Sequence, residues 1–320
     1  MKKAKETTVF LLFFLTFFYF DFIQATSTPD TFEDSIVSIN NVVEGIDENS
    51  CEYYVSICAF FKDEGDYLKE WIEYHRLIGI EHFYLYNNNS CDNYLEVLQP
   101  YIKKGLVDLI DWPSPEGTDW TPYQEQAFNH CIELCIGHTR WLAVIDIDEF
   151  IIPVDRPTLK SFLIDFDHET SLGGIMMFWQ CYGTSWVKTI PDNKLMIECL
   201  TWKAPWDHSW NRQVKSICKP HKVSHYCVHG AHYKSGYHDI TTSGTGGPNQ
   251  PIQIDRIRVN HYWTRTEDYF LNVKVPRRAI LEGREYTPEQ IQAFFQSFNT
   301  VEDKAIFRFL PELRELIFKK

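Results

Sequence analysis

Three carboxylates accompany an apolar run near the middle of the chain. Residues 141–153 read WLAVIDIDEFIIP, which places Asp146, Asp148 and Glu149 at the end of that run. Residues i and i+2 of a strand face the same way, so Asp146 and Asp148 are predicted to point together and Glu149 to point elsewhere. Two neighbouring carboxylates repel unless a cation lies between them, and Mg²⁺ and Mn²⁺ prefer such oxygens and are often shared with phosphates. The pattern predicts a metal–diphosphate site. Its alternative is one helix cap and one solvated aspartate.

The segments before this motif alternate between strand-like and helix-like patterns. Runs rich in β-branched and aromatic residues are followed by segments with apolar residues at helical spacing. Such alternation predicts an α/β fold whose parallel sheet carries helices on both faces and binds ligands beyond the carboxyl ends of its strands. We expect strands at 54–61, 82–87, 106–112 and 141–148, and helices at 66–79, 93–105 and 123–138.

Polar residues stand at the ends of these expected strands. Lys62 and Glu64 follow the first strand, and Asn87 and Asp92 lie at and after the end of the second. Carboxyl ends of parallel strands meet at one edge, so these side chains are predicted to converge near the aspartate pair, as a nucleotide pocket requires. For each residue taken alone, an ordinary turn is the alternative.

The second half of the chain is less regular. Several tryptophans lie there, at positions suited either to sugar stacking or to core packing. We interpret this half as a mixed extension of the same domain, so that the whole sheet is mixed, mostly parallel and flanked by helices. The expected β-like runs are 174–183, 195–202, 213–220 and 254–263, and the expected helices begin at Thr287 and cover 301–318.

The motifs together resemble glycosyltransferase family 92, a family with the nucleotide-sugar-binding GT-A fold. The match is strongest in the first half and covers about 52–280 in pattern. Asp63 and Asn87 depart from the family, which has Asn and Asp there. The residues that carry the resemblance are Lys62 to Glu64, Tyr67, Leu68, Glu70, Trp71, Tyr74, His75, Gly79, Tyr86 to Asn88, Ser90, Asp92, Asp146, Asp148 to Phe150, Lys215 to Ile217, Pro220, Val228, His229, His261 and Tyr262.

This resemblance implies a function. Family members resemble inverting transferases that move a sugar, often galactose, from a UDP-sugar to a glycan acceptor. It implies Mn²⁺ (or Mg²⁺) as the cofactor, a UDP-sugar donor and a glycan acceptor as partners. By the same resemblance the metal ligands are Asp146 and Asp148 with His229 or His261, and the nucleotide-sugar site draws on Lys62, Glu64, Asn87, Asp92 and Asp146.

An inverting transfer also needs a general base, which removes the proton of the acceptor hydroxyl. Asp207 and Glu198 of the second half are the candidates. Glu149 is a poor one, because its expected strand parity turns it away from the metal. The histidines of 221–238 fit no specific zinc spacing, and a hydrogen-bonded histidine is the alternative for each of them.

The N-terminal segment has the pattern of a targeting signal. A basic start precedes the apolar run 9–20, and Asp21 interrupts that run before it reaches the length of a membrane span. We expect 1–25 to be a cleavable signal peptide or a membrane anchor and 26–50 to be a linker. The transferase domain is expected at 51–320, with a nucleotide-binding half (51–150) and an acceptor-binding half (151–320).

The composition narrows the alternatives. The formal net charge of −13 argues against a nucleic-acid partner. The N-terminal segment indicates a secretory or exported location, either a Golgi-type lumen or membrane with possible membrane association, or a bacterial envelope. The nine cysteines predict mostly buried thiols, some of which could pair.

Two other functions remain open, namely a metal-dependent phosphohydrolase of the haloacid dehalogenase type and a secreted glycan-binding protein on a transferase scaffold.

Overall fold

A computed structural model of the chain describes residues 46–319, apart from 247–249 and 284. The expected signal or anchor at 1–25 and most of the expected linker lie outside these residues. Within the described part, no helix combines the length and the apolar character that crossing a bilayer requires. The compact unit considered below is Asp47–Lys320. It begins with a 3-10 turn, η1, at the end of the expected linker (Glu48–Ser50).

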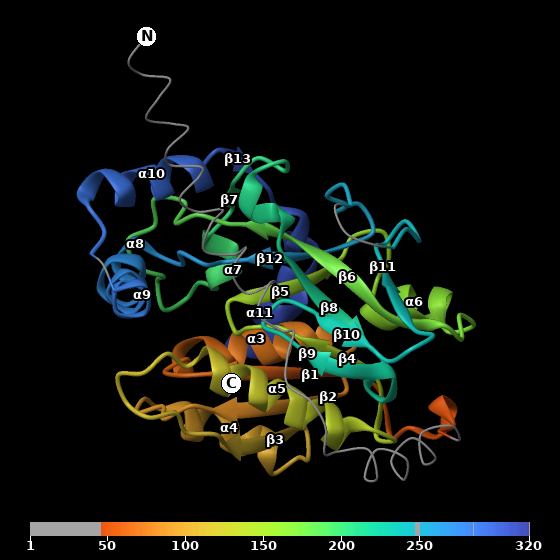
Figure 1. Ribbon diagram of the computed structural model, residues 1–320. Helices are drawn as coiled ribbons and strands as arrows, with labels where there is room; N and C mark the ends of the chain where they lie inside the picture. Colours follow the sequence, from red (N-terminus) through yellow and green to blue (C-terminus); the bar gives the residue numbers. More distant parts are fainter. Residues whose placement is uncertain (1–45, 247–249, 284, 320) are drawn as a thin grey trace. The chain divides into compact units, whose positions relative to one another are not determined.

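The first half of this unit alternates strands and helices, as predicted. The strands are all parallel, in the spatial order β3-β2-β1-β4 (Figure 1). Each of these strands is connected to the next by a crossover that carries one helix, as parallel strands require. The elements are β1 (Tyr53–Phe61), α3 (Gly65–Leu77), β2 (His82–Asn87), α4 (Tyr94–Ile102), β3 (Val107–Asp111), α5 (Thr121–Cys135) and β4 (Thr139–Val144).

The second half extends the same sheet beyond β4, in the order β8-β6-β12-β5, with β11 also paired to β6. Strand β8 is antiparallel to both of its neighbours, whereas β6 runs parallel to β11 and β12. The sheet is therefore mixed and mostly parallel, which confirms the predicted fold class. The strands are β5 (Glu149–Pro153), β6 (Leu172–Cys181), β8 (Val214–Cys218), β11 (His238–Ile240) and β12 (Ile257–His261).

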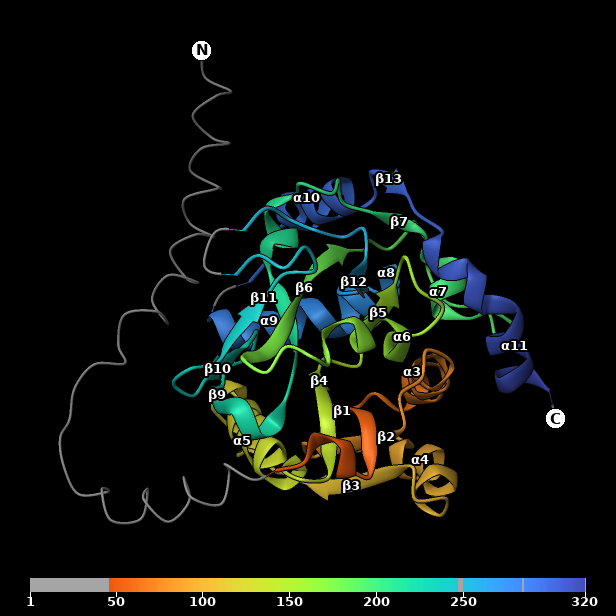
Figure 2. The ribbon, with the colours of Figure 1, turned by 90° about the vertical axis from the view of Figure 1, so that its right-hand side faces the viewer.

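Shorter elements surround this extension. Two small sheets pair β9 with β10 and β7 with β13, and both views place β7 and β13 beside α10 (Figures 1 and 2). These elements are α6 (Leu159–Leu163), η2 (Ile164–Phe166), α7 (Met196–Cys199), β7 (Trp202–Lys203), η3 (Ser209–Arg212), η4 (Pro220–Lys222), β9 (Val223–Tyr226), β10 (Ala231–Tyr233), α8 (Glu267–Tyr269), the π-helical turn η5 (Phe270–Lys274), α9 (Val275–Glu282), α10 (Pro288–Phe298), β13 (Val301–Glu302), η6 (Ala305–Phe309) and α11 (Leu310–Phe318).

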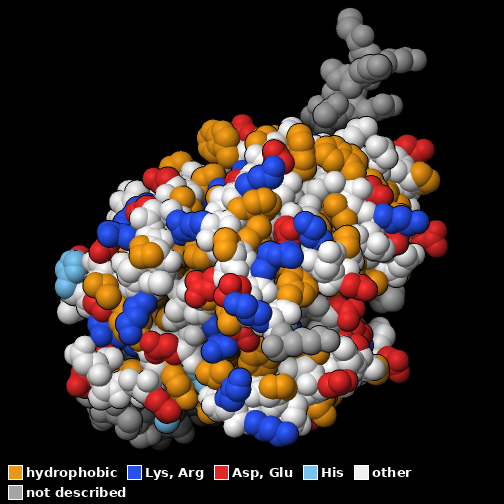
Figure 3. Space-filling model, turned by 180° about the vertical axis from the view of Figure 1, so that it is seen from behind, with side chains coloured by type: hydrophobic (Ala, Val, Ile, Leu, Met, Phe, Trp, Pro, Cys, Tyr) orange, Lys and Arg blue, Asp and Glu red, His pale blue; other side chains and the backbone are white. Residues whose placement is uncertain are grey.

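Helices cover both faces of the parallel strands, because alternate side chains of a strand point to opposite faces. Phe83 of β2 contacts Trp71 of α3, whereas its neighbour Tyr84 packs in the cluster that contains Phe128 of α5. Figure 2 shows α3 and α5 on opposite sides of β1 and β4. All nine cysteines lie in the described part, and five of them are buried. On the outer face seen in Figure 3, acidic, basic and hydrophobic side chains are interspersed.

Two expected strands differ from the observed structure. The run 195–202 was expected to be β-like, but its first part forms α7, and only Trp202 belongs to a strand. The run 141–148 was expected to be one strand, but β4 ends at Val144 and a turn precedes β5. Apolar content alone does not separate a buried strand from a buried turn or short helix, and this accounts for both errors.

Candidate active site

The aspartate motif lies in the connection from β4 to β5, at the carboxyl end of β4. The connection is fixed from outside, because Tyr262 donates its backbone N–H to the Asp148 carbonyl at 2.8 Å and Trp71 donates its indole N–H to the Glu149 carbonyl at 2.8 Å. Strand alternation therefore does not orient these side chains. The expectation that Glu149 points away was wrong, since its carboxylate accepts from the Asp146 N–H at 2.9 Å.

A buried lysine joins two of the carboxylates. The Lys215 Nζ of β8 lies 2.9 Å from Asp146 Oδ2 and 3.6 Å from Glu149 Oε2, and neither the lysine nor the glutamate side chain is exposed. Gln124 of α5 donates to the other Asp146 oxygen at 3.1 Å. Burial, together with repulsion from the aspartates, raises the pKa of Glu149 well above its usual value, although Lys215 opposes this. Asp146 and Glu149 thus share one cation.

Asp148 has a separate set of partners from the C-terminal part of the chain. Its carboxylate lies 3.0 Å from Lys274 Nζ and 3.4 Å from His261 Nε2. Burial alone would raise the pKa of Asp148, but Lys274 and His261 lower it well below the usual value. Burial also lowers the pKa of His261, which leaves this imidazole neutral near pH 7 with a proton on only one ring nitrogen.

The two histidines expected near the metal both lie beside this group of charges. The Trp179 ring of β6 contacts His261 at a centroid distance of 4.2 Å and His229 at 5.2 Å. His229 follows Val228, whose carbonyl accepts from Lys215 at 3.2 Å. Burial, then Lys215 and His261, lower the pKa of His229 to about 3. The loop between β9 and β10 therefore presents a neutral imidazole next to Lys215.

A buried arginine completes the charged group. Arg265 pairs with Glu64, which follows β1, at 2.5 Å, and the guanidinium lies over the rings of Tyr67 and Tyr269 at 3.7 and 4.6 Å. Its backbone has φ +49°, a left-handed conformation that costs energy for a side chain of this size. Burial and the Asp148 charge raise the pKa of Glu64, and Arg265 opposes them.

The remaining residues expected at the strand ends lie in two loops that are joined by hydrogen bonds. Asp92 Oδ2 accepts from the Gly65 N–H at 2.6 Å, and a Cβ on Gly65 would fall 2.2 Å from an Asn93 side-chain oxygen, so a larger residue here would have to displace Asn93. The Asn87 amide donates to Tyr94 and to Asp111, at 3.1 and 3.0 Å. Asn87 and Asp92 therefore shape the loops after β1 and β2. Lys62 is half-buried in the first of these loops.

The two residues expected to supply the general base do not join the charged group. Glu198 of α7 is paired with Lys194 and Arg314, each at 2.5 Å. Asp207 is exposed in the turn after β7. Helix α7 is itself held by Glu70, which accepts from the Met196 and Ile197 N–H groups, and burial raises the pKa of Glu70 to about 7. The sequence positions of Glu198, Asp207 and Glu70 did not predict these contacts.

Three cations of the site were not assigned from the sequence. Lys215 and Lys274 each hold one aspartate, and Arg265 holds Glu64. Lys215 stood in a motif that resembled the family, and Arg265 comes four residues after His261. The available signal was the position of Lys215 inside the β-like run 213–220. A charge that such a strand turns into the core needs a partner.

The donor set has the chemistry for a hard divalent cation. No group of three His, Cys, Asp or Glu side chains within the described residues is arranged to hold a metal ion. One pair does come together, since a carboxylate oxygen of Asp148 lies 3.4 Å from His261 Nε2, and the buried Nδ1 of His261 has no hydrogen-bond partner. Oxygen and imidazole ligands suit Mn²⁺ and, less well, Mg²⁺. In the described structure the lysines carry the positive charge beside both aspartates.

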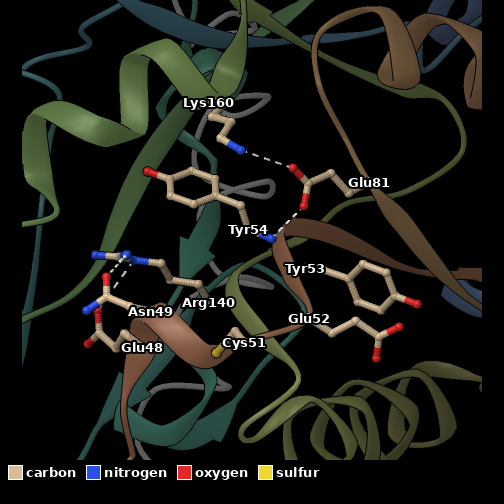
Figure 4. A pocket seen from close by; sticks show the side chains of 9 residues that line it. All are labelled: Glu48, Asn49, Cys51, Glu52, Tyr53, Tyr54, Glu81, Arg140 and Lys160. Carbon is tan, nitrogen blue, oxygen red and sulfur yellow. Dashed lines mark hydrogen bonds and ion pairs between the residues drawn. The ribbon is translucent and has the colours of Figure 1, made fainter.

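A hollow of about 330 Å³ lies at the other edge of the sheet (Figure 4). It is lined by residues at the amino ends of β1 and β4 and by η1 and α6. Lys160 pairs with Glu81 at 3.3 Å, and Arg140 pairs with Glu48 at 3.7 Å. Parallel sheets bind ligands at their carboxyl edge, so the buried charges around Asp146 and Asp148 are the candidate site rather than this hollow.

This chain belongs to glycosyltransferase family 92, whose family model matches residues 52–274. The match spans the whole charged group, from Glu64 to Lys274. The resemblance drawn from the sequence motifs is therefore confirmed. The match also favours the transferase expectation over the phosphohydrolase alternative.

Curated plant proteins are similar over part of the chain. A glycosyltransferase family 92 protein of Ricinus communis is 27% identical over 57% of this chain and 32% of its own length. A protein of the same family from Oryza sativa subsp. japonica is 30% identical over 42% of this chain and 22% of its own. A galactan beta-1,4-galactosyltransferase of Arabidopsis thaliana is 34% identical over 30% of this chain and 20% of its own. The chain thus spans about a third or less of these relatives.

Solved structures are similar at low identity. S. aureus TarS matches 83% of this chain and 75% of its own, with 10% identity and a TM-score of 0.34. Glucosyl-3-phosphoglycerate synthase from Mycobacterium tuberculosis, crystallised with Mn²⁺ and UDP, matches 48% of this chain and 50% of its own, with 12% identity and a TM-score of 0.28.

Proposed function

We propose that this chain transfers a sugar from a UDP-sugar to a glycan acceptor, with a divalent cation at Asp146, Asp148 and a histidine. The observation that supports this most directly is the group of buried charges at the carboxyl edge of the sheet. Lys215 and Glu149 are fully buried there, and Asp148 is nearly so. Burying several charges destabilises a fold unless they are paired, so such a group is typical of a site that holds a charged ligand.

The paired aspartates of the site fit the chemistry of a diphosphate leaving group. A departing nucleoside diphosphate carries developing negative charge, and a bound Mn²⁺ or Mg²⁺ would neutralise it. The chain's own contribution is a fixed frame, in which Lys215 orients Asp146, while Lys274 and His261 orient Asp148. Side chains held in this way need little reorganisation during the reaction, which is the main source of electrostatic catalysis.

The names of relatives suggest which donor and acceptor to test first. Relatives named galactan beta-1,4-galactosyltransferases make UDP-galactose the first donor to test and β-1,4-galactan the first acceptor. We propose inversion, in which the acceptor hydroxyl attacks the α-linked donor directly and gives a β-linked product. The general base is also a proposal, and Glu198 and Asp207, the candidates named from the sequence, are to be tested by substitution.

The location is also a proposal. Nucleotide sugars are made in the cytosol, and a transporter-fed lumen of the Golgi type would supply them to an exported chain. The N-terminal segment 1–25 would then serve as the signal or anchor.

A donor screen tests the function. Purified protein is incubated with Mn²⁺, each UDP-sugar in turn and galactan oligosaccharides, and UDP release and product mass are followed. We expect one UDP-sugar to give transfer, EDTA to stop it and Mn²⁺ to restore it. Anomeric proton couplings of the fresh product by NMR should show a β-linkage. Absence of transfer from every donor would contradict the proposal, and an α-linked product would contradict inversion alone.

A further inference from the structure

Two tryptophans differ from the others in their exposure. The chain has ten tryptophans, and Trp186 and Trp206 are each 58% exposed, whereas the other eight are buried or half-buried. A large aromatic side chain left in water forgoes the free energy of burial. Both lie in segments close to the end of β6, so their exposure is not scattered over the surface.

Trp186 is held out of the core by its loop. Ser185 and Trp186 both have left-handed backbones, with φ +51° and +57°, and each such residue costs energy. The loop keeps this conformation because Asn299 accepts from the Ser185 N–H at 2.8 Å, while the Ser185 hydroxyl accepts from the Trp202 N–H at 2.8 Å. Trp186 packs against Trp202 in an edge-to-face arrangement, at a centroid distance of 5.0 Å, and still keeps 58% of its surface exposed.

The loop that carries Trp206 is joined to the end of β6 through the side chain of Asn211. Asn211 donates to the Trp206 carbonyl at 3.3 Å and to the Pro205 carbonyl at 2.8 Å. The oxygen of the same amide accepts from the N–H of Cys181, the last residue of β6, at 2.8 Å. Asn211 is fully buried, so this connection between the loop and the strand end is shielded from water.

The end of β6 adjoins the charged group. Cys181 is the register partner of His261, whose imidazole contacts Asp148. Beyond the strands, the Glu267 N–H donates to the Val187 carbonyl at 2.9 Å. This bond joins the residue after Trp186 to the segment that carries Arg265. Both exposed tryptophans therefore lie on loops that border the site.

We propose that Trp186 and Trp206 bind the glycan acceptor by stacking against its sugar rings. This inference rests on the proposed function and names the residues that recognise its acceptor. One face of a pyranose ring presents C–H groups, which pack flat on an indole and leave the hydroxyls in water. Thr184, Ser185 and Trp202 around Trp186 are uncharged, which favours a neutral glycan over an acidic one.

Substitution of each tryptophan tests this inference with an oligosaccharide probe. Wild type, Trp186→Ala, Trp206→Ala and the control Leu134→Ala are titrated with β-1,4-galactan oligosaccharides of four to six residues by calorimetry. Leu134 is 43% exposed on α5, near the amino ends of the strands, so it matches the loss of an exposed apolar side chain. We expect each tryptophan variant to bind the probe about 10–100-fold more weakly and to raise the acceptor KM similarly.

Donor binding separates this role from general damage. UDP affinity and the melting temperature should stay at wild-type values in Trp206→Ala, whose backbone is unstrained, even if Trp186→Ala is destabilised. Trp186→Phe should recover part of the affinity. Unchanged probe binding in both alanine variants, or no binding by wild type, would overturn the inference. Tryptophan-dependent binding without sugar transfer would instead overturn the proposed function alone.

Discussion

Two lysine pairs at opposite edges of the sheet differ in burial, although the amino edge also buries Lys219 and Lys222 beside Glu48. At the carboxyl edge, Lys215 and Arg265 have no exposed side-chain surface. At the amino edge, the Lys160 side chain is 47% exposed and its partner Glu81 is 35% exposed. A solvated pair contributes at most ~1 kcal/mol, whereas a buried charge that loses its partner costs ~3–5 kcal/mol. Burial, rather than the number of charges, distinguishes the Lys215 pair from the Lys160 pair, and its place at the carboxyl edge of the parallel strands marks the candidate site.

The largest expected effect concerns the buried lysine. Lys215→Met keeps the side-chain volume but leaves Asp146 and Glu149 without their shared cation. We expect a loss of about 3–5 kcal/mol in the free energy of unfolding, measured by urea denaturation. The double variant Lys215→Met, Glu149→Leu should recover part of the loss. A single variant as stable as wild type would show that the carboxyl edge tolerates unpaired charge, which contradicts the comparison.

The second prediction concerns the effect of Asp148 on sugar transfer. Asp148→Asn removes the charge that faces Lys274 and His261, and we expect transfer to fall by about 10²–10³-fold or more. Asp155→Asn is the control, because Asp155 pairs with Arg256 in a part-exposed bridge. Circular dichroism should show both variants folded. Equal activity of the two variants would remove Asp148 from the site.

A buried histidine beneath the site gives a pH dependence. Burial lowers the pKa of His75 to about 3, and its ring nitrogens contact the Trp71 carbonyl and the Ile151 N–H. The unfolded chain takes up this proton near pH 6.5 and the folded chain does not, so stability is full above 6.5 and declines as the pH falls towards 3. A variant without His75 should lose free energy of unfolding less steeply as the pH falls, by about 1.4 kcal/mol per pH unit. His75→Gln, compared with wild type by denaturation at pH 4, 5, 6 and 7, measures this, and parallel curves would contradict it.

The smallest expected effect lies at the amino edge. Lys160→Met should change the free energy of unfolding by about 0–1 kcal/mol, since its bridge to Glu81 is solvated. Salt titration sharpens the comparison, because 0.5 M NaCl should erase the Lys160 effect but leave most of the Lys215 effect. A Lys160 effect as large as that of Lys215 would mean that the two edges do not differ.

The sequence by itself determined the elements and the chemistry of the motif. Apolar patterns predict β1 to β3 and the helices up to β4, because periodicity follows from backbone geometry, which is local, but they misjudged where β4 ends. The motif also placed Asp146 and Asp148 at the carboxyl edge, whereas His229 or His261 was implied as their neighbour only by the family resemblance. Family membership could be read from the sequence, since each motif that carries the resemblance is a short stretch of neighbouring residues.

Only the tertiary structure decided which charges meet. Lys215, Arg265 and Lys274 come from β8, from the segment after β12 and from η5, and the Glu149 carboxylate turned inward although strand parity predicted the opposite. The sheet order brings β8 next to β4 and β12 next to β5, and no local pattern encodes that order. The pairing of Glu198 was not predictable for the same reason, because its partner Arg314 lies 116 residues away in sequence. Ion pairs are made across such distances, so only the folded chain defines them.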